Sequence, residues 1–202
     1  TGKAYRGDYS AALDRTQFSI KPGVAPKARL FALKIYGDNA SEATELVLDT
    51  LEWSADPDGD LDFSDRLDVL NFSIGSSYGL DSQGDIEAGA FQRLIGLGCV
   101  VVAATGNASN NFYLVSAPSV EPGVISVSTS RLDSGKPRVP SNNSRGPSSP
   151  WSRLKPEISA PGITVHSAKM GSINPLLSNV VPASGGHQYV SLPRAALVGA
   201  SH

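Results

Sequence analysis

The sequence predicts an α/β fold, a three-layer αβα sandwich around a mainly parallel sheet. Short apolar segments of strand length alternate with amphipathic segments of helix length along residues 30–104. The last of these apolar segments, residues 99–104, is rich in valine and has no polar alternation, which is typical of a strand covered on both faces. Because strands that alternate with helices are joined by right-handed crossovers, the sheet is expected to lie between helices.

The elements of this fold can be placed from the spacing of apolar residues. In the first helix apolar side chains recur every four residues up to Ala55, and Ser41 is a suitable N-cap. In the second helix they recur from Ile86 to Leu97, and Gly98 is a suitable end. The predicted elements, in order, are a strand at 30–36, a helix at 41–55, a strand at 67–72, a helix at 86–97 and strands at 99–104 and 124–129.

The composition excludes several classes of protein. The 202 residues include 17 basic and 19 acidic side chains, so the formal net charge is −2, and we expect neither nucleic acid nor a membrane as a partner. With 40% hydrophobic residues the chain can bury a core, which excludes full disorder. The one cysteine, Cys99, excludes an intrachain disulfide and a cysteine-ligated metal cluster, and its apolar surroundings predict a core position.

Small polar and glycine-containing segments follow two of the predicted strands, at 71–75 and at 104–107. In open parallel sheets, ligands lie beyond the carboxyl ends of the strands, and glycine lets a substrate backbone come close. The side-chain amide of Asn107 could donate a hydrogen bond to a developing oxyanion. The alternative is that Asn107 is only a turn residue after Gly106, since Gly-Asn is a common turn dipeptide.

The glycine fingerprints of nucleotide-binding proteins are missing. Gly96 and Gly98 precede their strand instead of following it, and the third glycine of a dinucleotide-binding loop is absent. Gly135-Lys136 is followed by Pro137, where a phosphate-binding loop needs Ser or Thr. A nucleotide-binding function is therefore disfavoured.

An acidic loop at residues 56–65 is a candidate cation site. Alternate carboxylates around a glycine turn can converge on one hard cation, and Ca²⁺ takes six to eight oxygen ligands. The loop differs from an EF-hand, because its glycine is fourth and no glutamate closes it. The alternative is a solvated acidic turn, in which close carboxylates repel one another. The candidate ligands are Asp56, Asp58, Asp60, Asp62 and Asp65.

Five segments, taken in order, resemble the motifs of one family. They are 23–30 (GVAPKARL), 69–75 (VLNFSIG), 101–107 (VVAATGN), 116–127 (SAPS followed by VISV) and 144–162 (SRGP followed by KPEISAPG). The chain resembles the catalytic domain of the subtilisin-like serine proteases (subtilases, peptidase S8 family) over roughly residues 23–168. The resemblance implies a subtilisin-like fold, a single domain over residues 1–202, and peptide or protein substrates.

The resemblance also implies roles for particular residues. Asn107 corresponds to the oxyanion-hole donor of the family. The backbone of Ser73, Ile74 and Gly75 is expected to pair with the substrate as an added strand. One wall of the primary specificity pocket is expected to consist of Ala104, Thr105 and Gly106. The acidic loop is similar to those of secreted bacterial members with large inserts, so we expect a secreted protein.

The chain departs from the family pattern in its catalytic triad. The aspartate motif and the histidine motif that precede GVAP in the family are both absent, and residues 1–22 contain no histidine. The serine motif expected after SAPG is also absent. Residues 199–201 (Gly-Ala-Ser) have only its Gly-x-Ser outline. The three histidines, His166, His187 and His202, stand in other contexts. We therefore expect an internal fragment, truncated at both ends and inactive alone.

Two further expectations follow from these departures. The alternative to a protease fragment is a non-catalytic, subtilase-like module that binds peptides or another protein. In either case, segments that the family packs against the sheet lie outside the matched motifs, and apolar surface exposed there favours a homodimer.

Overall fold

The computed structural model describes residues 24–25, 28–35, 45–76, 78–80, 85–163, 165–168, 179–182 and 188–192. The chain divides into two compact units, which are described separately. The first contains Thr1–Leu33 and Val165–Leu192, and the second contains Lys34–Thr164 and Pro193–His202. The predictions for Ser41, His187, Ser201 and His202 fall outside the described residues.

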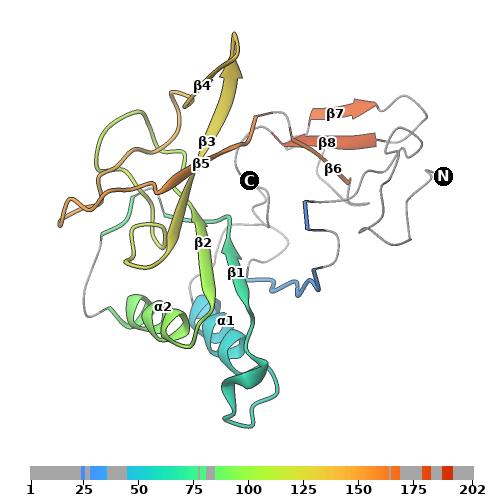
Figure 1. Ribbon diagram of the computed structural model, residues 1–202, viewed down its shortest axis with the longest axis vertical. Helices are drawn as coiled ribbons and strands as arrows, with labels where there is room; N and C mark the ends of the chain where they lie inside the picture. The colour runs from blue at the N-terminus through green and yellow to red at the C-terminus, as the bar shows by residue number, and fades with distance from the viewer. Residues whose placement is uncertain are drawn as a thin grey trace. The chain divides into compact units, whose positions relative to one another are not determined.

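The second unit is built on a mainly parallel sheet (Figure 1). Its strands run in the order β1-β2-β3-β4, with β5 paired to β3. The pairs β1–β2, β2–β3 and β3–β5 are parallel, whereas the short β4 forms an antiparallel pair with the end of β3. The strands are β1 (Val69–Phe72), β2 (Val100–Ala104), β3 (Ile125–Asp133), β4 (Lys136–Arg138) and β5 (Ile158–Pro161). The predicted α/β class with a mainly parallel sheet is confirmed.

The two described α-helices lie side by side and contact each other (Figure 1). They are α1 (Glu45–Ala55) and α2 (Ile86–Gly96), and a short 3-10 helix, η2, spans Phe63–Asp65. Leu51 of α1 and Phe91 of α2 are almost fully buried, and the Phe91 ring meets Phe72 of β1 edge to face at 5.1 Å. Burial of such apolar side chains is the main stabilising term of the unit. Neither α-helix is long and apolar enough to cross a membrane.

Both ends of α2 have identifiable causes. The side chain of Asp85 accepts a hydrogen bond from the backbone N–H of Glu87, at 3.1 Å, and so caps the first turn. After the last turn Gly98 adopts a φ of +95°, which side-chain-bearing residues rarely take. The predicted helix of 86–97 is therefore confirmed to within one residue.

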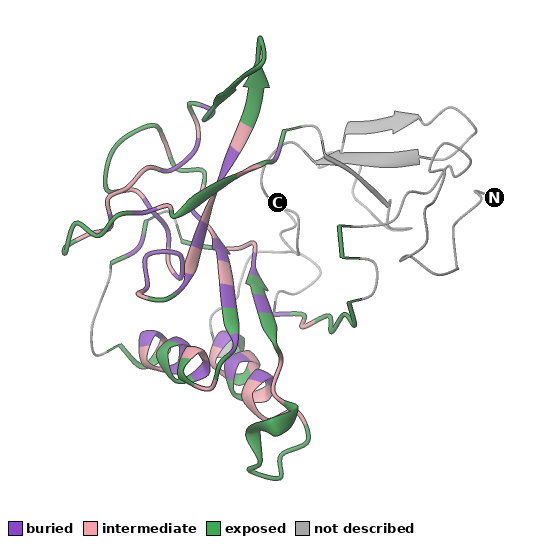
Figure 2. Cartoon of the chain, viewed as in Figure 1, coloured by how far each residue is buried: buried purple, intermediate pink, exposed green. Residues whose placement is uncertain are grey.

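Burial alternates along the first two strands, so the cover expected for both faces of 99–104 is complete on one face and partial on the other among the described residues. Leu70 and Phe72 of β1 and Val101 of β2 are buried, whereas Val69 and Val100 are 58% and 45% exposed (Figure 2). Successive strand residues point to opposite faces. The described helices thus leave one face of the sheet partly open.

The strand predicted at 30–36 is wrong for the part that is described. Residues 28–35 have no regular secondary structure, and Leu30 is 91% exposed. An apolar run becomes a strand only when it finds a partner to share hydrogen bonds, and none of the described strands pairs with it.

Several strands in the second half of the chain were not predicted. β5 is short and half polar, so it lacks a clear period. The first unit contains a three-stranded antiparallel sheet in the order β6-β8-β7. Its strands are β6 (Val165–Ala168), β7 (Asn179–Pro182) and β8 (Gln188–Leu192), and His166 lies in β6.

Candidate active site

The parallel register of β1 and β2 brings the two predicted site segments together at the carboxyl ends of these strands. Asn71 is paired with Val102 and Phe72 with Ala103, in parallel. Residues 73–75 follow β1 and residues 105–107 follow β2, so the two segments leave the sheet side by side. Because β1 is at the edge of the described sheet, its continuation has one side to which an added strand could pair.

The side chain of Ser116 lies between these two segments. Its backbone N–H donates to the carbonyl of Thr105 at 2.9 Å, and its hydroxyl donates to the carbonyl of Ala104 at 3.2 Å. A methyl group placed on Gly75 would lie 2.6 Å from the Ser116 Oγ, and one on Gly106 would lie 3.1 Å from it. Ser116 is fully buried, bonded to residues 104 and 105, and in close approach to Gly75.

A tight turn follows β2 and presents Asn107. Gly106 has a φ of +99°, a conformation that glycine adopts without strain. The turn is held from both sides by Ser144, whose N–H donates to the Gly106 carbonyl and whose Oγ accepts from the N–H of Ala108, each at 3.0 Å. Asn107 is exposed, and its side chain makes no hydrogen bond to the described residues. Its amide is therefore available to a ligand.

The segment 73–75 is held at both ends by hydrogen bonds. The Asn71 side-chain amide donates to the Ser73 hydroxyl at 3.0 Å. Beyond Gly75, the N–H of Ser76 donates to the carbonyl of Ala117 at 3.3 Å, and the Ser76 hydroxyl accepts from the Ala117 N–H at 3.1 Å. Ser73 and Ile74 are half-buried and Gly75 is exposed. Both ends of a short extended segment are thus fixed.

The acidic loop brings three of its five carboxylates together. Asp56, Asp58 and Asp60 place one potential ligand atom each within 4.8 Å of the others. Asp62 instead caps η2 by accepting from the N–H of Ser64, at 3.0 Å, and Asp65 lies within η2. Neither Asp62 nor Asp65 belongs to the three-carboxylate group.

The loop is shaped by its own carboxylates. Asp56 accepts hydrogen bonds from the N–H groups of Gly59, at 2.8 Å, and Leu61, at 3.0 Å, and Asp60 accepts from Asp62 at 2.7 Å. Lost hydration inside the loop and then the negative charge of Asp60 raise the pKa of Asp58 above its usual 3.8. A carboxylate oxygen has more than one lone pair, so this set retains the oxygen donors that Ca²⁺ prefers.

Comparison with known proteins decides the family. Residues 9–190 match the model of the Subtilase family, and these residues include both strand-end segments and the acidic loop. The chain belongs to the subtilase family. The resemblance predicted from the sequence is therefore confirmed, and the chain is related to the subtilisin-like serine proteases.

Individual subtilases are similar to this chain over most of its length. Subtilisin DY of Bacillus licheniformis is 31% identical over 159 residues, which cover 78% of this chain and 49% of that protein. Subtilisin-like protease 3 of Pseudogymnoascus destructans is 31% identical over 149 residues, covering 74% of this chain and 33% of that protein. The solved structure of Sphericase matches with a TM-score of 0.60 and 26% identity, over 74% of this chain and 48% of that one.

The chain spans between a third and a half of the length of these curated subtilases. The predicted site residues that the structure describes lie in two places, the strand ends and the acidic loop. Sequence reasoning missed Ser116 and Ser144, which support the strand ends. Both occur inside segments that resemble subtilase motifs, and that position was the only signal available for them.

Proposed function

We propose that this chain is part of a secreted subtilisin-like serine endopeptidase, which hydrolyses peptide bonds. The observation that carries the proposal is the junction of residues 73–75 and 104–107 around Ser116, beside the free amide of Asn107. Secretion is proposed from the resemblance of the acidic loop to those of secreted members, and the full-length protein is expected in the culture medium of the cells that make it.

The described residues would bind substrate and stabilise charge. A peptide paired along Ser73, Ile74 and Gly75 as an added strand would present its carbonyl beside the turn after β2. Ala104, Thr105 and Gly106 would form one wall of the pocket for the side chain next to the scissile bond. When a serine supplied by the full-length protein attacks the carbonyl, with a histidine as base, negative charge develops on the carbonyl oxygen. The Asn107 amide would donate to that oxygen.

The 202-residue chain alone is expected to be inactive, because the family's histidine and serine motifs are absent from it. The measurement is release of soluble peptides from casein by the isolated chain and by the full-length protein. The full-length protein should cleave casein and be blocked by a serine-directed inhibitor. Inhibitor-sensitive cleavage by the isolated chain would contradict the prediction and point to Ser201. Casein binding without cleavage by the full-length protein would favour the non-catalytic module.

The open face of the sheet supports our proposal that the isolated chain forms a homodimer. Val69, Val100 and Ile158 belong to three strands of one sheet and are each about half exposed, at 58%, 45% and 53%. Burying such apolar surface against a second copy is favourable. The preparation used for the casein assay should therefore elute as a dimer in size-exclusion chromatography with light scattering. A monomer at micromolar concentration would rule this out.

We propose a structural Ca²⁺ at Asp56, Asp58 and Asp60, whose ligand atoms lie within 4.8 Å of one another. Lost hydration and then the negative charge of Asp60 raise the pKa of Asp58, and the cation would offset the second of these causes. Calorimetric titration of the full-length protein at pH 7 should show binding at or below millimolar Ca²⁺. D60N should weaken it by roughly tenfold, whereas D49N, on the exposed side of α1, should not. Protons compete for a carboxylate whose pKa is raised, so the affinity should fall as the pH drops toward that pKa. Absence of binding heat would exclude the site.

A further inference from the structure

A cavity of about 430 Å³ lies next to the proposed substrate segment, within the second unit. It is lined by Ser76 and residues 78–80, by the start of α2 and its cap Asp85, and by Ala117, Pro118 and Glu121. Its size is in the range of pockets that bind small molecules or side chains. The comparisons with subtilases assign no role to it.

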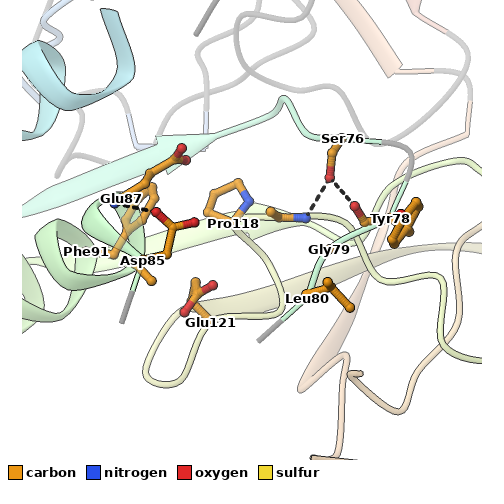
Figure 3. Close-up of a pocket in the computed structure, with 11 residues that line it drawn as sticks. Ser76, Tyr78, Gly79, Leu80, Asp85, Glu87, Phe91, Pro118 and Glu121 are labelled. Carbon is orange, nitrogen blue, oxygen red and sulfur yellow. Dashed lines mark hydrogen bonds between the residues drawn. The ribbon is translucent and has the colours of Figure 1, made fainter. Parts of the chain in front are cut away.

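The lining of the cavity combines apolar and acidic groups. Leu80, Phe91 and Pro118 supply apolar surface. Asp85, Glu87 and Glu121 supply three carboxylates, and no lysine, arginine or histidine occurs among the described lining residues. Figure 3 shows Asp85 and Glu121 on one side of the space, with Leu80 across from them. The cavity is therefore negatively charged and has apolar walls.

The three cavity carboxylates do not form a compact metal site. In the described part of the chain, the one group of acidic residues close enough to hold a metal ion is Asp56, Asp58 and Asp60, so the cavity carboxylates do not converge on one point. The guanidinium group of arginine carries five donors in a planar fork and can bridge separated acceptors, and its methylene stem can pack on apolar surface. The ammonium of lysine is a compact point charge and suits such spacing less well.

The electrostatic state of Glu87 agrees with a cationic ligand. Burial and the neighbouring Asp85 carboxylate raise the pKa of Glu87. Asp85 is fixed because it accepts from the Glu87 N–H at 3.1 Å as the cap of α2. A cation in the cavity would favour the charged form of Glu87.

We propose that this cavity binds an arginine side chain of a peptide held along residues 73–75, with its stem on the exposed side chain of Leu80 and its guanidinium at Asp85 and Glu87. The proposal rests on the proposed function, because it takes the peptide to be the substrate of the protease. It identifies the substrates as peptides with arginine at one fixed position. Ser76, which lines the cavity, directly follows Gly75, so a peptide paired along that segment passes beside the opening.

The test is a library of fluorogenic peptides cleaved by the full-length protein, with arginine, lysine or citrulline fixed at one position at a time. Citrulline has nearly the shape of arginine and no charge. At one position arginine should exceed citrulline by about tenfold in kcat/KM, with lysine between them. Glu87→Gln should reduce that preference by roughly three- to tenfold, and it keeps the backbone N–H that donates to Asp85 at the start of α2.

A matched control and a second measurement make every outcome informative. Glu52→Gln changes the net charge equally at an exposed position of α1 and should leave the arginine preference intact.

If peptides are cleaved but arginine and citrulline are equivalent at every position, the cavity proposal is wrong and the proposed function stands. If no peptide is cleaved, the proposed function fails, and fluorescence anisotropy with labelled arginine and citrulline peptides decides. Equal affinities overturn the cavity proposal, whereas tighter arginine binding that Glu87→Gln abolishes supports it.

Discussion

Replacing Asn107 by leucine in the full-length protein is expected to lower kcat by about 10²- to 10³-fold, with KM little changed; this range comes from the oxyanion donor of subtilisin itself and is carried over from that relative. Leucine has nearly the shape of asparagine but donates no hydrogen bond. The lost interaction forms only as charge develops on the carbonyl oxygen, so binding of the uncharged substrate should be preserved. Steady-state kinetics on one peptide substrate measures both constants.

Asn110 provides the matched control, because it is exposed in the same loop, three residues beyond Asn107. Asn110→Leu should retain kcat within about twofold, as expected for an exposed substitution. Thermal unfolding of both variants shows whether the turn still folds. If Asn107→Leu keeps full kcat while both proteins remain folded, Asn107 is a turn residue and not the oxyanion donor.

Replacing Lys155 by methionine is expected to lower the free energy of unfolding by about 2–4 kcal/mol. The Lys155 side chain is 3% exposed, and its Nζ lies 2.7 Å from a carboxylate oxygen of Glu157. The same Nζ donates to the carbonyls of Glu121, at 3.1 Å, and Val124, at 2.7 Å. Methionine fills much of the space but leaves both carbonyls without this donor. Because Glu157 is itself 41% exposed, most of the loss should come from these two hydrogen bonds and not from the ion pair.

Urea unfolding of the full-length protein, inhibited to prevent self-digestion, measures this loss. Lys136→Met is the control, since Lys136 is exposed on the short strand β4, and its effect should stay within about 0.5 kcal/mol. Equal midpoints for Lys155→Met and Lys136→Met would show that the buried amine contributes nothing net. Lys155→Met would also remove the cationic partner of Glu157, which accepts a hydrogen bond from the N–H of Ser126 at 2.7 Å.

The sequence was informative where a local pattern determines the structure. α2 was predicted correctly because its apolar residues repeat at helical spacing and Gly98 ends it, and β1 and β2 because short apolar runs flank that helix. The same reasoning predicted that the segments 71–75 and 104–107 follow strands of a parallel sheet, and the register then showed that these strands are neighbours. It failed for residues 30–35, because the pairing that makes an apolar run a strand is not a local property.

The supporting contacts of the site could not be predicted for the same reason. The Ser116 hydroxyl reaches Ala104 across 12 residues, and the Ser144 hydroxyl reaches Ala108 across 36. The cavity is lined by Ser76 and residues 78–80, by the start of α2 and by Ala117, Pro118 and Glu121. Its three acidic residues belong to no sequence motif, so the sequence alone does not indicate that they share a cavity. Such combinations become visible only once the sheet register places these segments together.

The hydrogen bonds inside the acidic loop bear on how a cation would be captured. Asp56, Asp58 and Asp60 accept hydrogen bonds from backbone N–H groups two to five residues ahead of them, so the loop's own hydrogen bonds hold its turns. Ordering a flexible loop costs conformational entropy, and preorganisation removes much of that cost from the binding step. Little of the free energy of ion binding would therefore be offset by the cost of ordering the loop. The conformation of the loop should change little when an ion binds.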